Sequence, residues 1–274
     1  MNEMTTLLLI VVATLVAGVG SVWLAAWLSF GVLTRYTQHM LSLAAGALLA
    51  TAFLNLLPEA FESELEPHQL FLTLLAGLIF FFLLDKAELW HHGHEHHHGD
   101  GGHDHAHHDH AHHHHHHHNA APRTGAWSVL AGDSLHCFGD GILIASAFVA
   151  DWHLGVVAAL AVLVHEVPHH MGDLAVIAQN RTSSRAAVWK VSVAGALTAM
   201  GGVVGYVLVD ALHDQLPYFL VVASSSFVYV ALADLIPQLQ KRLSLQQTLA
   251  QVFWLAVGML AVWAVASSVG GHAH

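Results

Sequence analysis

Eight long apolar stretches constrain the fold of this chain more than any other feature of its sequence. Each is close to the roughly 20 residues that an α-helix needs to cross a bilayer. Because backbone groups in lipid must pair internally, helices are the expected structure for such runs. The sequence therefore predicts an all-α, polytopic membrane protein with eight transmembrane helices. They span about residues 5–32, 39–61, 69–90, 127–150, 154–179, 187–210, 217–238 and 248–270.

The charged residues are few, and this limits the classes of partner. Only 10% of the 274 residues are charged, against roughly 25% in a soluble domain. Eight Lys and Arg residues are too few and too scattered for a nucleic-acid surface. The single cysteine excludes an internal disulfide. We expect lipid as a partner, with no nucleic acid and no resident cofactor.

The basic residues fall in alternate connections between the apolar stretches. Cytoplasmic loops of membrane proteins are enriched in Lys and Arg, so this alternation supports the count of eight and sets the orientation. We expect a multi-pass protein of the cell membrane, inner or plasma, with both termini outside the cytoplasm. The basic positions are Arg35, Lys86, Arg123, Arg181, Arg185, Lys190, Lys241 and Arg242.

A histidine-rich segment divides the chain. Residues 91–118 contain eighteen histidines with interspersed glycines and acids, a composition that cannot build a core. We interpret 1–90 as helices one to three, 91–124 as a disordered cytoplasmic loop, and 125–274 as helices four to eight. The three parts form one membrane domain. Neutral imidazole binds zinc well, so we expect accessory metal capture by this loop.

Metal-binding side chains recur at helical spacing in the two stretches that follow the loop. Residues four apart share a helix face, so His136 lies above Asp140 and His165 above His169. A charge in hydrocarbon costs about 2.5–3.5 kcal/mol on insertion scales, which makes such clusters functional hypotheses. We predict a site for one or two divalent ions between these helices. Its candidate ligands are His136, Asp140, His165, Glu166, His169 and His170, with Asn55, Cys137, Asp173 and Asp234 as candidate pathway residues.

Proline and glycine accompany these ligands. Pro168 offers no N–H to the carbonyl four residues earlier and is expected to kink its helix. Small residues let transmembrane helices approach closely, and this is the role we predict for Gly139, Gly141 and Gly172.

A short pattern occurs at the ends of the second and seventh apolar stretches. One ends Asn55-Leu-Leu-Pro58-Glu59 and the other Asp234-Leu-Ile-Pro237-Gln238. An inverted repeat of helices one to three and six to eight, around a central pair, would give this pattern (3+2+3). Two ordinary proline-ended helices explain it nearly as well.

The two ligand-rich segments resemble the ZIP family of divalent-metal transporters. His136-Cys-Phe-Gly-Asp140-Gly141 is similar to the family's fourth-helix motif, His-Asn-x-x-Asp-Gly. Residues 165–173, His-Glu-Val-Pro-His-His-Met-Gly-Asp, are similar to its fifth-helix motif, His-Glu-x-Pro-His-Glu-x-Gly-Asp. The resemblance implies a ZIP-like bundle that moves zinc into the cytoplasm, with Cd²⁺, Fe²⁺ and Mn²⁺ as alternative cargoes. We also expect a homodimer as one of the assemblies that this chain can form.

By position, the resemblance also implies roles for individual residues. The family's binuclear centre would take His136, Asp140, His165 and His169 as its main site, with Asp140 and His169 shared with a second site that includes Glu166. Two departures affect that second site, because Cys137 replaces the usual Asn and His170 the usual Glu. More nitrogen and sulfur ligands favour zinc over manganese.

Two other functions fit part of the pattern. His165-Glu166-x-x-His169 matches the zinc-protease motif, which makes an intramembrane metalloprotease an alternative, although Pro168 disturbs the turn that presents both histidines. A cation-diffusion-facilitator exporter also uses a His-rich loop and a His-x-x-x-Asp pair, but it expects six helices and cytoplasmic termini. We therefore predict a transporter and not an enzyme.

Overall fold

The computed structural model describes residues 3–29, 37–93, 125–179, 183–239 and 244–270, and every regular element within these ranges is helical. Eight helical stretches are long and apolar enough to cross a membrane, which confirms the predicted fold class. The first part of the predicted histidine-rich loop belongs to a helix, since α5 extends to Gly93. Its remainder, 94–124, lies outside the described residues.

Five of the membrane-length stretches are single helices, and three combine α-helical with π-helical turns. The single helices are α5 (Pro67–Gly93), α6 (Gly125–Ala150), α7 (Trp152–Gln179), α8 (Ser184–Ala211) and α11 (Leu245–Gly270). The composite ones are α1–η1–α2 (Glu3–Leu15, Val16–Gly20, Ser21–Ser29), α3–η3–α4 (Thr37–Thr51, Ala52–Leu56, Leu57–Phe61) and α9–η6–α10 (Leu216–Tyr229, Val230–Leu235, Ile236–Leu239).

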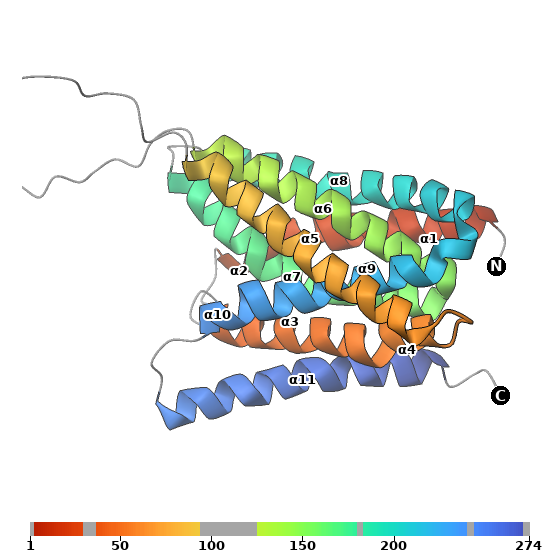
Figure 1. Cartoon of the computed structure of the whole chain (residues 1–274). Helices are drawn as coiled ribbons and strands as arrows, with labels where there is room; N and C mark the ends of the chain where they lie inside the picture. Colours follow the sequence, from red (N-terminus) through yellow and green to blue (C-terminus); the bar gives the residue numbers. More distant parts are fainter. Residues whose placement is uncertain (1–2, 30–36, 94–124, 180–182, 240–243, 271–274) are drawn as a thin grey trace, which may run out of the picture.

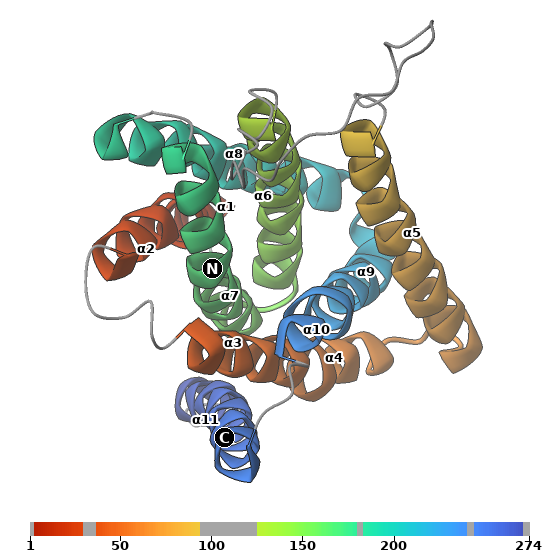
Figure 2. The same cartoon turned by 90° about the vertical axis from the view of Figure 1, so that its left-hand side faces the viewer.

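Helix α7 lies at the centre of the bundle (Figures 1 and 2). It contacts α2, α3, α6 and α8, while α11 packs mainly on α3 and α5 mainly on α9. In the apolar span of α7, 72% of the residues are buried within the protein, against 11% for α5 and α11. Polar side chains on α7 can therefore face protein and not lipid.

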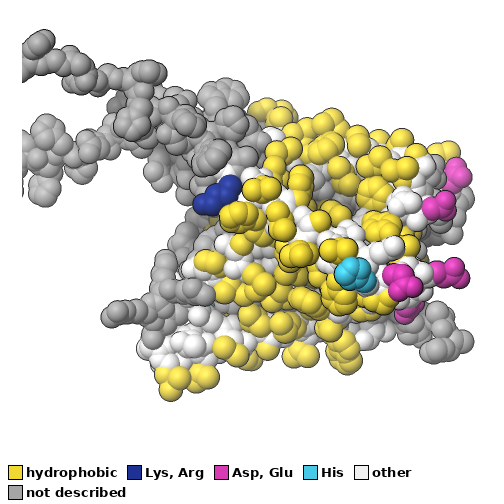
Figure 3. Space-filling model, in the orientation of Figure 1, with side chains coloured by type: hydrophobic (Ala, Val, Ile, Leu, Met, Phe, Trp, Pro, Cys, Tyr) yellow, Lys and Arg dark blue, Asp and Glu magenta, His cyan; other side chains and the backbone are white. Residues whose placement is uncertain are grey.

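The face of the molecule drawn in Figure 3 has the polarity of a membrane-spanning bundle. Figure 3 shows a broad apolar belt across the middle, acidic side chains at one end and basic side chains at the other. The acidic end is where α1 begins and α11 ends, and the basic end is where α5 ends and α6 begins (Figure 1).

Glycines bring α6 and α8 into close contact. A Cβ added at Gly141 would overlap the backbone of Thr198 and Gly202, and one added at Gly201 would overlap the backbone of Phe138. Close approach was predicted at Gly141, and the structure confirms it there. It fixes the position of α6, which carries the candidate residues His136, Cys137 and Asp140.

The same prediction is wrong for Gly139 and Gly172. No described atom lies within 4 Å of a Cβ built at either position. Gly139 lies three residues after His136, and Gly172 three after His169, so each shares a helix face with a candidate ligand. These glycines leave space beside the ligands instead of closing a helix contact.

The two proline-ended helices share a local distortion. In each, a π-helical segment directly precedes the proline turn: η3 lies before Pro58 and η6 before Pro237. A proline removes one N–H from the helical ladder, and a π-turn accommodates the carbonyl left without its usual donor. By contrast, α7 stays α-helical through Pro168.

The contact between α6 and α8 generates a stability prediction. Gly141→Val places side-chain atoms against the α8 backbone, so we expect destabilisation of about 1–3 kcal/mol, the usual result of overpacking. Gly139→Ala is the matched control, since its Cβ meets open space and alanine is the better helix former by about 0.5–1 kcal/mol. Thermal unfolding in detergent measures both. Equal melting temperatures for the two variants would contradict the role given to Gly141.

Candidate metal centre

Side chains from α6 and α7 form a first group of ligand atoms, which we call site 1: His136, Asp140, His165 and Glu166. One turn of α6 presents His136 and Asp140, and consecutive positions of α7 present His165 and Glu166. All except His136 are buried, and His136 keeps 28% of its side chain exposed. Site 1 thus has one partly open side.

The spacing within site 1 matches a tetrahedral zinc ion. Ligands at about 2.0–2.2 Å from zinc lie roughly 3.3–3.6 Å from one another. Nε2 of His165 lies 3.4 Å from Nε2 of His136, 3.3 Å from Oδ2 of Asp140 and 3.2 Å from Oε1 of Glu166. Nε2 of His136 lies 3.3 Å from the same Glu166 oxygen and 3.8 Å from the Asp140 oxygen. Four of these five distances are 3.2–3.4 Å, close to the spacing of ligands around a tetrahedral zinc ion.

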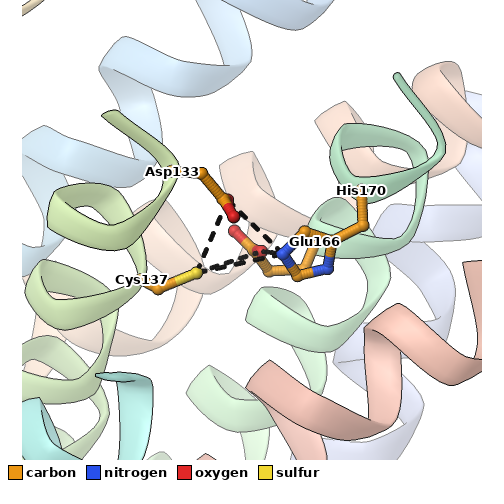
Figure 4. Close-up of side chains that lie close together, drawn as sticks. All are labelled: Asp133, Cys137, Glu166 and His170. Carbon is orange, nitrogen blue, oxygen red and sulfur yellow. Dashed lines mark hydrogen bonds and ion pairs between the residues drawn. The ribbon is translucent and has the colours of Figure 1, made fainter. Parts of the chain in front are cut away.

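A second group, site 2, comprises Asp133, Cys137, Glu166 and His170, which converge from α6 and α7 in Figure 4. Nε2 of His170 lies 3.0 Å from Oε2 of Glu166 and 3.4 Å from Oδ1 of Asp133. The thiol sulfur lies 3.7–3.9 Å from these three atoms, close to the roughly 3.5–3.7 Å expected when one ligand is a sulfur at about 2.3 Å from zinc. All four residues are buried.

Glu166 links the two sites. Its Oε1 faces the histidines of site 1 and its Oε2 faces His170 in site 2. A carboxylate that offers one oxygen to each of two ions can bridge them. The geometry is therefore that of a paired metal centre within the bundle.

Hydrogen bonds behind the ligands fix two imidazole rings. Nδ1 of His165 donates to the carbonyl of Ala161 at 3.3 Å. The Ser21 hydroxyl donates to the carbonyl of Gly18 at 2.6 Å and lies 3.0 Å from Nδ1 of His170. Since the hydroxyl hydrogen is already used, the His170 ring donates to Ser21. Both rings then turn an unprotonated Nε2 toward a metal site, the arrangement typical of zinc-binding histidines.

A third group, which we call site 3, comprises Asp133, His169 and Asp173. Nε2 of His169 lies 3.8 Å from Oδ1 of Asp133 and 3.8 Å from Oδ2 of Asp173. The resemblance had implied that His169 belongs to the main site. Here its ring stacks on that of His136, with centroids 5.4 Å apart, while its Nε2 faces the two aspartates.

Several buried carboxylate oxygens in these sites lack a hydrogen-bond donor. Among the described residues, these are Oδ2 of Asp133, Asp140 and Asp173 and Oε1 of Glu166. A buried acceptor without a partner costs about 1–3 kcal/mol, and more when charged. A cation at site 1 would face two of these oxygens, Oδ2 of Asp140 and Oε1 of Glu166, and a cation at site 3 would face Oδ2 of Asp173.

The structure places the remaining predicted residues as follows. Cys137 joins site 2 and Asp173 joins site 3. Asn55 lies in η3 and donates to the carbonyl of Ala50 at 3.3 Å, a bond that pairs a backbone group of the π-helical region. The backbone of Asp234 belongs to η6, but its side chain lies outside the described part of the chain.

Asp133 is the ligand-type residue that the sequence analysis missed. It contributes to both site 2 and site 3. The signal was the helical spacing already used for the other ligands, since Asp133 lies four residues before Cys137 and three before His136.

The amino-acid sequence is similar to those of known zinc transporters. The sequence profile of the family described as "ZIP Zinc transporter" matches residues 86–266. Over 115 residues the chain is 36% identical to the human protein named zinc transporter ZIP4, covering 42% of this chain and 18% of that protein. It is 33% identical over 149 residues to zinc transporter zipt-7.2 of Caenorhabditis elegans (52% and 31%), and 23% identical over 243 residues to zinc transporter ZIP13 of Pongo abelii (82% and 65%). The chain thus spans less than a third of the first two relatives.

Ser21→Ala tests the support behind site 2. Loss of the hydrogen bond that orients His170 should weaken cadmium binding about 10–100-fold, the usual effect of removing such a partner. Cys137 is the chain's one cysteine, so cadmium–thiolate charge-transfer absorption reports site 2 and is blind to the many histidines. The control is Ser224→Ala, another buried serine, which donates to the carbonyl of Leu220 in α9. An unchanged affinity in Ser21→Ala would refute the orienting role.

Proposed function

The chain belongs to the ZIP zinc transporter family, and from this we propose that it carries zinc across a membrane through sites 1 and 2. One observation carries the proposal: most separations between the ligand atoms of site 1 are 3.2–3.4 Å, close to the spacing around a tetrahedral zinc ion, inside a membrane-spanning bundle. The family is one of transporters and not of enzymes. The HExxH spacing at 165–169 therefore belongs to a transporter, and the metalloprotease and diffusion-facilitator alternatives are set aside.

The arrangement suggests how an ion crosses. The partly exposed ring of His136 offers the first nitrogen to an arriving ion, and the buried Asp140, His165 and Glu166 then replace its water shell. Glu166 passes the ion to site 2 because its second oxygen already faces that site. At each step protein ligands replace water molecules around the ion. This replacement lowers the free-energy cost of dehydrating the ion within an apolar bundle.

The direction of transport follows from the charge distribution. Acidic residues gather at the end where the chain begins and ends, where they raise the local concentration of divalent cations. The basic end is the cytoplasmic end by the positive-inside rule. We infer that zinc enters at the acidic, outer end and leaves at the basic, cytoplasmic end of a cell membrane. The acidic residues are Glu62, Glu64, Glu66, Asp151 and Asp214.

Site 2 supports a preference for zinc and cadmium over manganese. Its donors include a thiol and an imidazole. Soft sulfur and nitrogen ligands favour zinc and its heavier congener, whereas manganese favours oxygen ligands. The selectivity proposal rests on Cys137 and His170, the two departures from the family pattern.

Zinc flux into proteoliposomes tests the transport proposal. His136→Ala and His165→Ala each remove one of four site 1 ligands, so we expect zinc uptake to fall at least about tenfold, beyond the effect of losing a supporting contact. His153→Ala is the matched control, because His153 lies in the first turn of α7, away from the three sites and paired with Asp151 at 2.9 Å. Normal flux in both site variants would refute the proposal. Zinc added separately to each face of oriented vesicles then assigns the direction.

Replacing Cys137 tests the selectivity proposal. We expect Cys137→Asn to lower cadmium transport relative to manganese transport severalfold, since site 2 loses its sulfur ligand. Cys137→Ser separates the loss of sulfur from a change of side-chain size. Competition of each metal with zinc uptake provides the measurement. An unchanged cadmium-to-manganese ratio in both variants would show that selectivity arises elsewhere.

A further inference from the structure

We propose that site 3 is a release site, where Asp133, His169 and Asp173 hold the divalent cation after it leaves sites 1 and 2. The inference rests on the proposed transport function and adds a step to it. It starts from the grouping of these three side chains, whose ligand atoms all lie within 4.8 Å of one another.

Site 3 is built more loosely than the paired sites. Its His169 nitrogen lies 3.8 Å from each aspartate oxygen, longer than the imidazole–carboxylate distances of 3.0–3.4 Å that dominate sites 1 and 2. It offers three protein ligands and leaves the fourth position of a tetrahedral ion to water. A looser, partly hydrated site suits an ion that is about to leave.

Asp133 provides an independent sign that a ligand belongs here. Its side chain is 1% exposed, its Oδ1 faces His169 and His170, and its Oδ2 has no hydrogen-bond partner among the described residues. A buried, unpartnered carboxylate oxygen is costly unless a cation or donor is supplied. Asp133 also belongs to site 2, so it can pass an ion onward as Glu166 does between sites 1 and 2.

The position of site 3 fits an exit. Asp133 lies eight residues after the start of α6, and Asp173 lies six residues before the end of α7. Both therefore lie in the halves of these helices that are nearer the basic end of the bundle. The side chain of His169 is 35% exposed and that of Asp173 is 12% exposed, whereas those of Glu166 and His170 in site 2 are at most 1% exposed.

Charge supplies the reason for an ion to move on. The three sites share four carboxylates, Asp133, Asp140, Glu166 and Asp173. Two divalent ions balance four ionised carboxylates, so a newly arrived ion at site 1 repels those already bound. Conduction through multi-site pores relies on the same repulsion between neighbouring ions. Site 3, which is the loosest of the three and the nearest to the basic end, then loses its ion first.

A single engineered thiol tests site 3 in the full-length protein. Cys137→Ser leaves no cysteine in the chain, and adding Asp173→Cys places one thiol in site 3. Cadmium titration in detergent, followed by cadmium–thiolate absorption, then reports this site alone. The matched control is Cys137→Ser with Asp151→Cys, in which the thiol replaces an aspartate of the turn between α6 and α7.

The proposal expects a saturable cadmium–thiolate signal from Asp173→Cys and none from Asp151→Cys. Adding His169→Ala should weaken cadmium binding at least about tenfold, whereas adding Ser224→Ala in α9 should leave it unchanged. Asp173→Asn, with Cys137 intact, should lower zinc flux severalfold while the cadmium affinity of Cys137 stays the same.

The outcomes separate this inference from the transport proposal. The release site would be overturned if Asp173→Cys gave no cadmium–thiolate signal, or if His169→Ala did not change that signal. The Cys137 signal and zinc flux would then still support sites 1 and 2. Normal flux in Asp173→Asn would also overturn it. Loss of cadmium binding at Cys137 together with absent zinc flux in the unmodified protein would instead remove the proposed function itself.

Discussion

The burial of carboxylates in an apolar bundle is the constraint on which the rest of this structure depends. Asp133, Asp140 and Glu166 are each at most 3% exposed, and each has an oxygen without a hydrogen-bond partner among the described residues. Such groups are retained in a membrane protein only where their partners are supplied. The Nε2 atoms of His165 and His170 that face these carboxylates are unprotonated and cannot donate to them, so a divalent cargo would supply the compensation. The need to keep these groups away from lipid explains why they lie between α6 and the central helix α7.

Rigid helix contacts hold the ligands at distances suited to the ion. Glycine contacts press α6 onto α8, and backbone or serine partners fix the rings of His165 and His170. A site formed in this way does not have to assemble around each arriving ion, so little binding energy is lost in ordering side chains. The open space beside Gly139 and Gly172 has the opposite effect, because it keeps the ligand-bearing faces accessible. Tight packing behind the ligands and space in front of them are what the proposed passage of an ion through sites 1 and 2 requires.

The sequence predicted the helices well because apolar length is a direct physical requirement for crossing a bilayer. It also predicted that ligands four apart would share a face, which is how His136 and Asp140 come to meet His165 and Glu166. Helical spacing predicts which face of the helix a residue occupies, but not the direction in which its ring nitrogen points. The Nε2 atom of His169 faces the aspartates of site 3 and not the ligands of site 1. A hydrophobic pattern with a period of 3.6 residues could not predict the π-helical turns before Pro58 and Pro237. The inverted repeat stays a prediction, because the π-helical segment η1 of the first stretch has no counterpart in α8.

The composition of site 2 shows how its chemistry can change while its charge does not. The motif that this chain resembles has Asn and Glu where Cys137 and His170 stand. A thiol that coordinates a metal is deprotonated, so the bound form of Cys137 supplies the negative charge that the absent glutamate would have carried, and His170 is neutral as a ligand. The two replacements therefore conserve the charge of the ion-bound site while exchanging oxygen donors for sulfur and nitrogen. Asp133, on the same face of α6 as Cys137, keeps one hard oxygen ligand in place. Site 2 can then retain the electrostatic attraction for a divalent cation while favouring the softer metals.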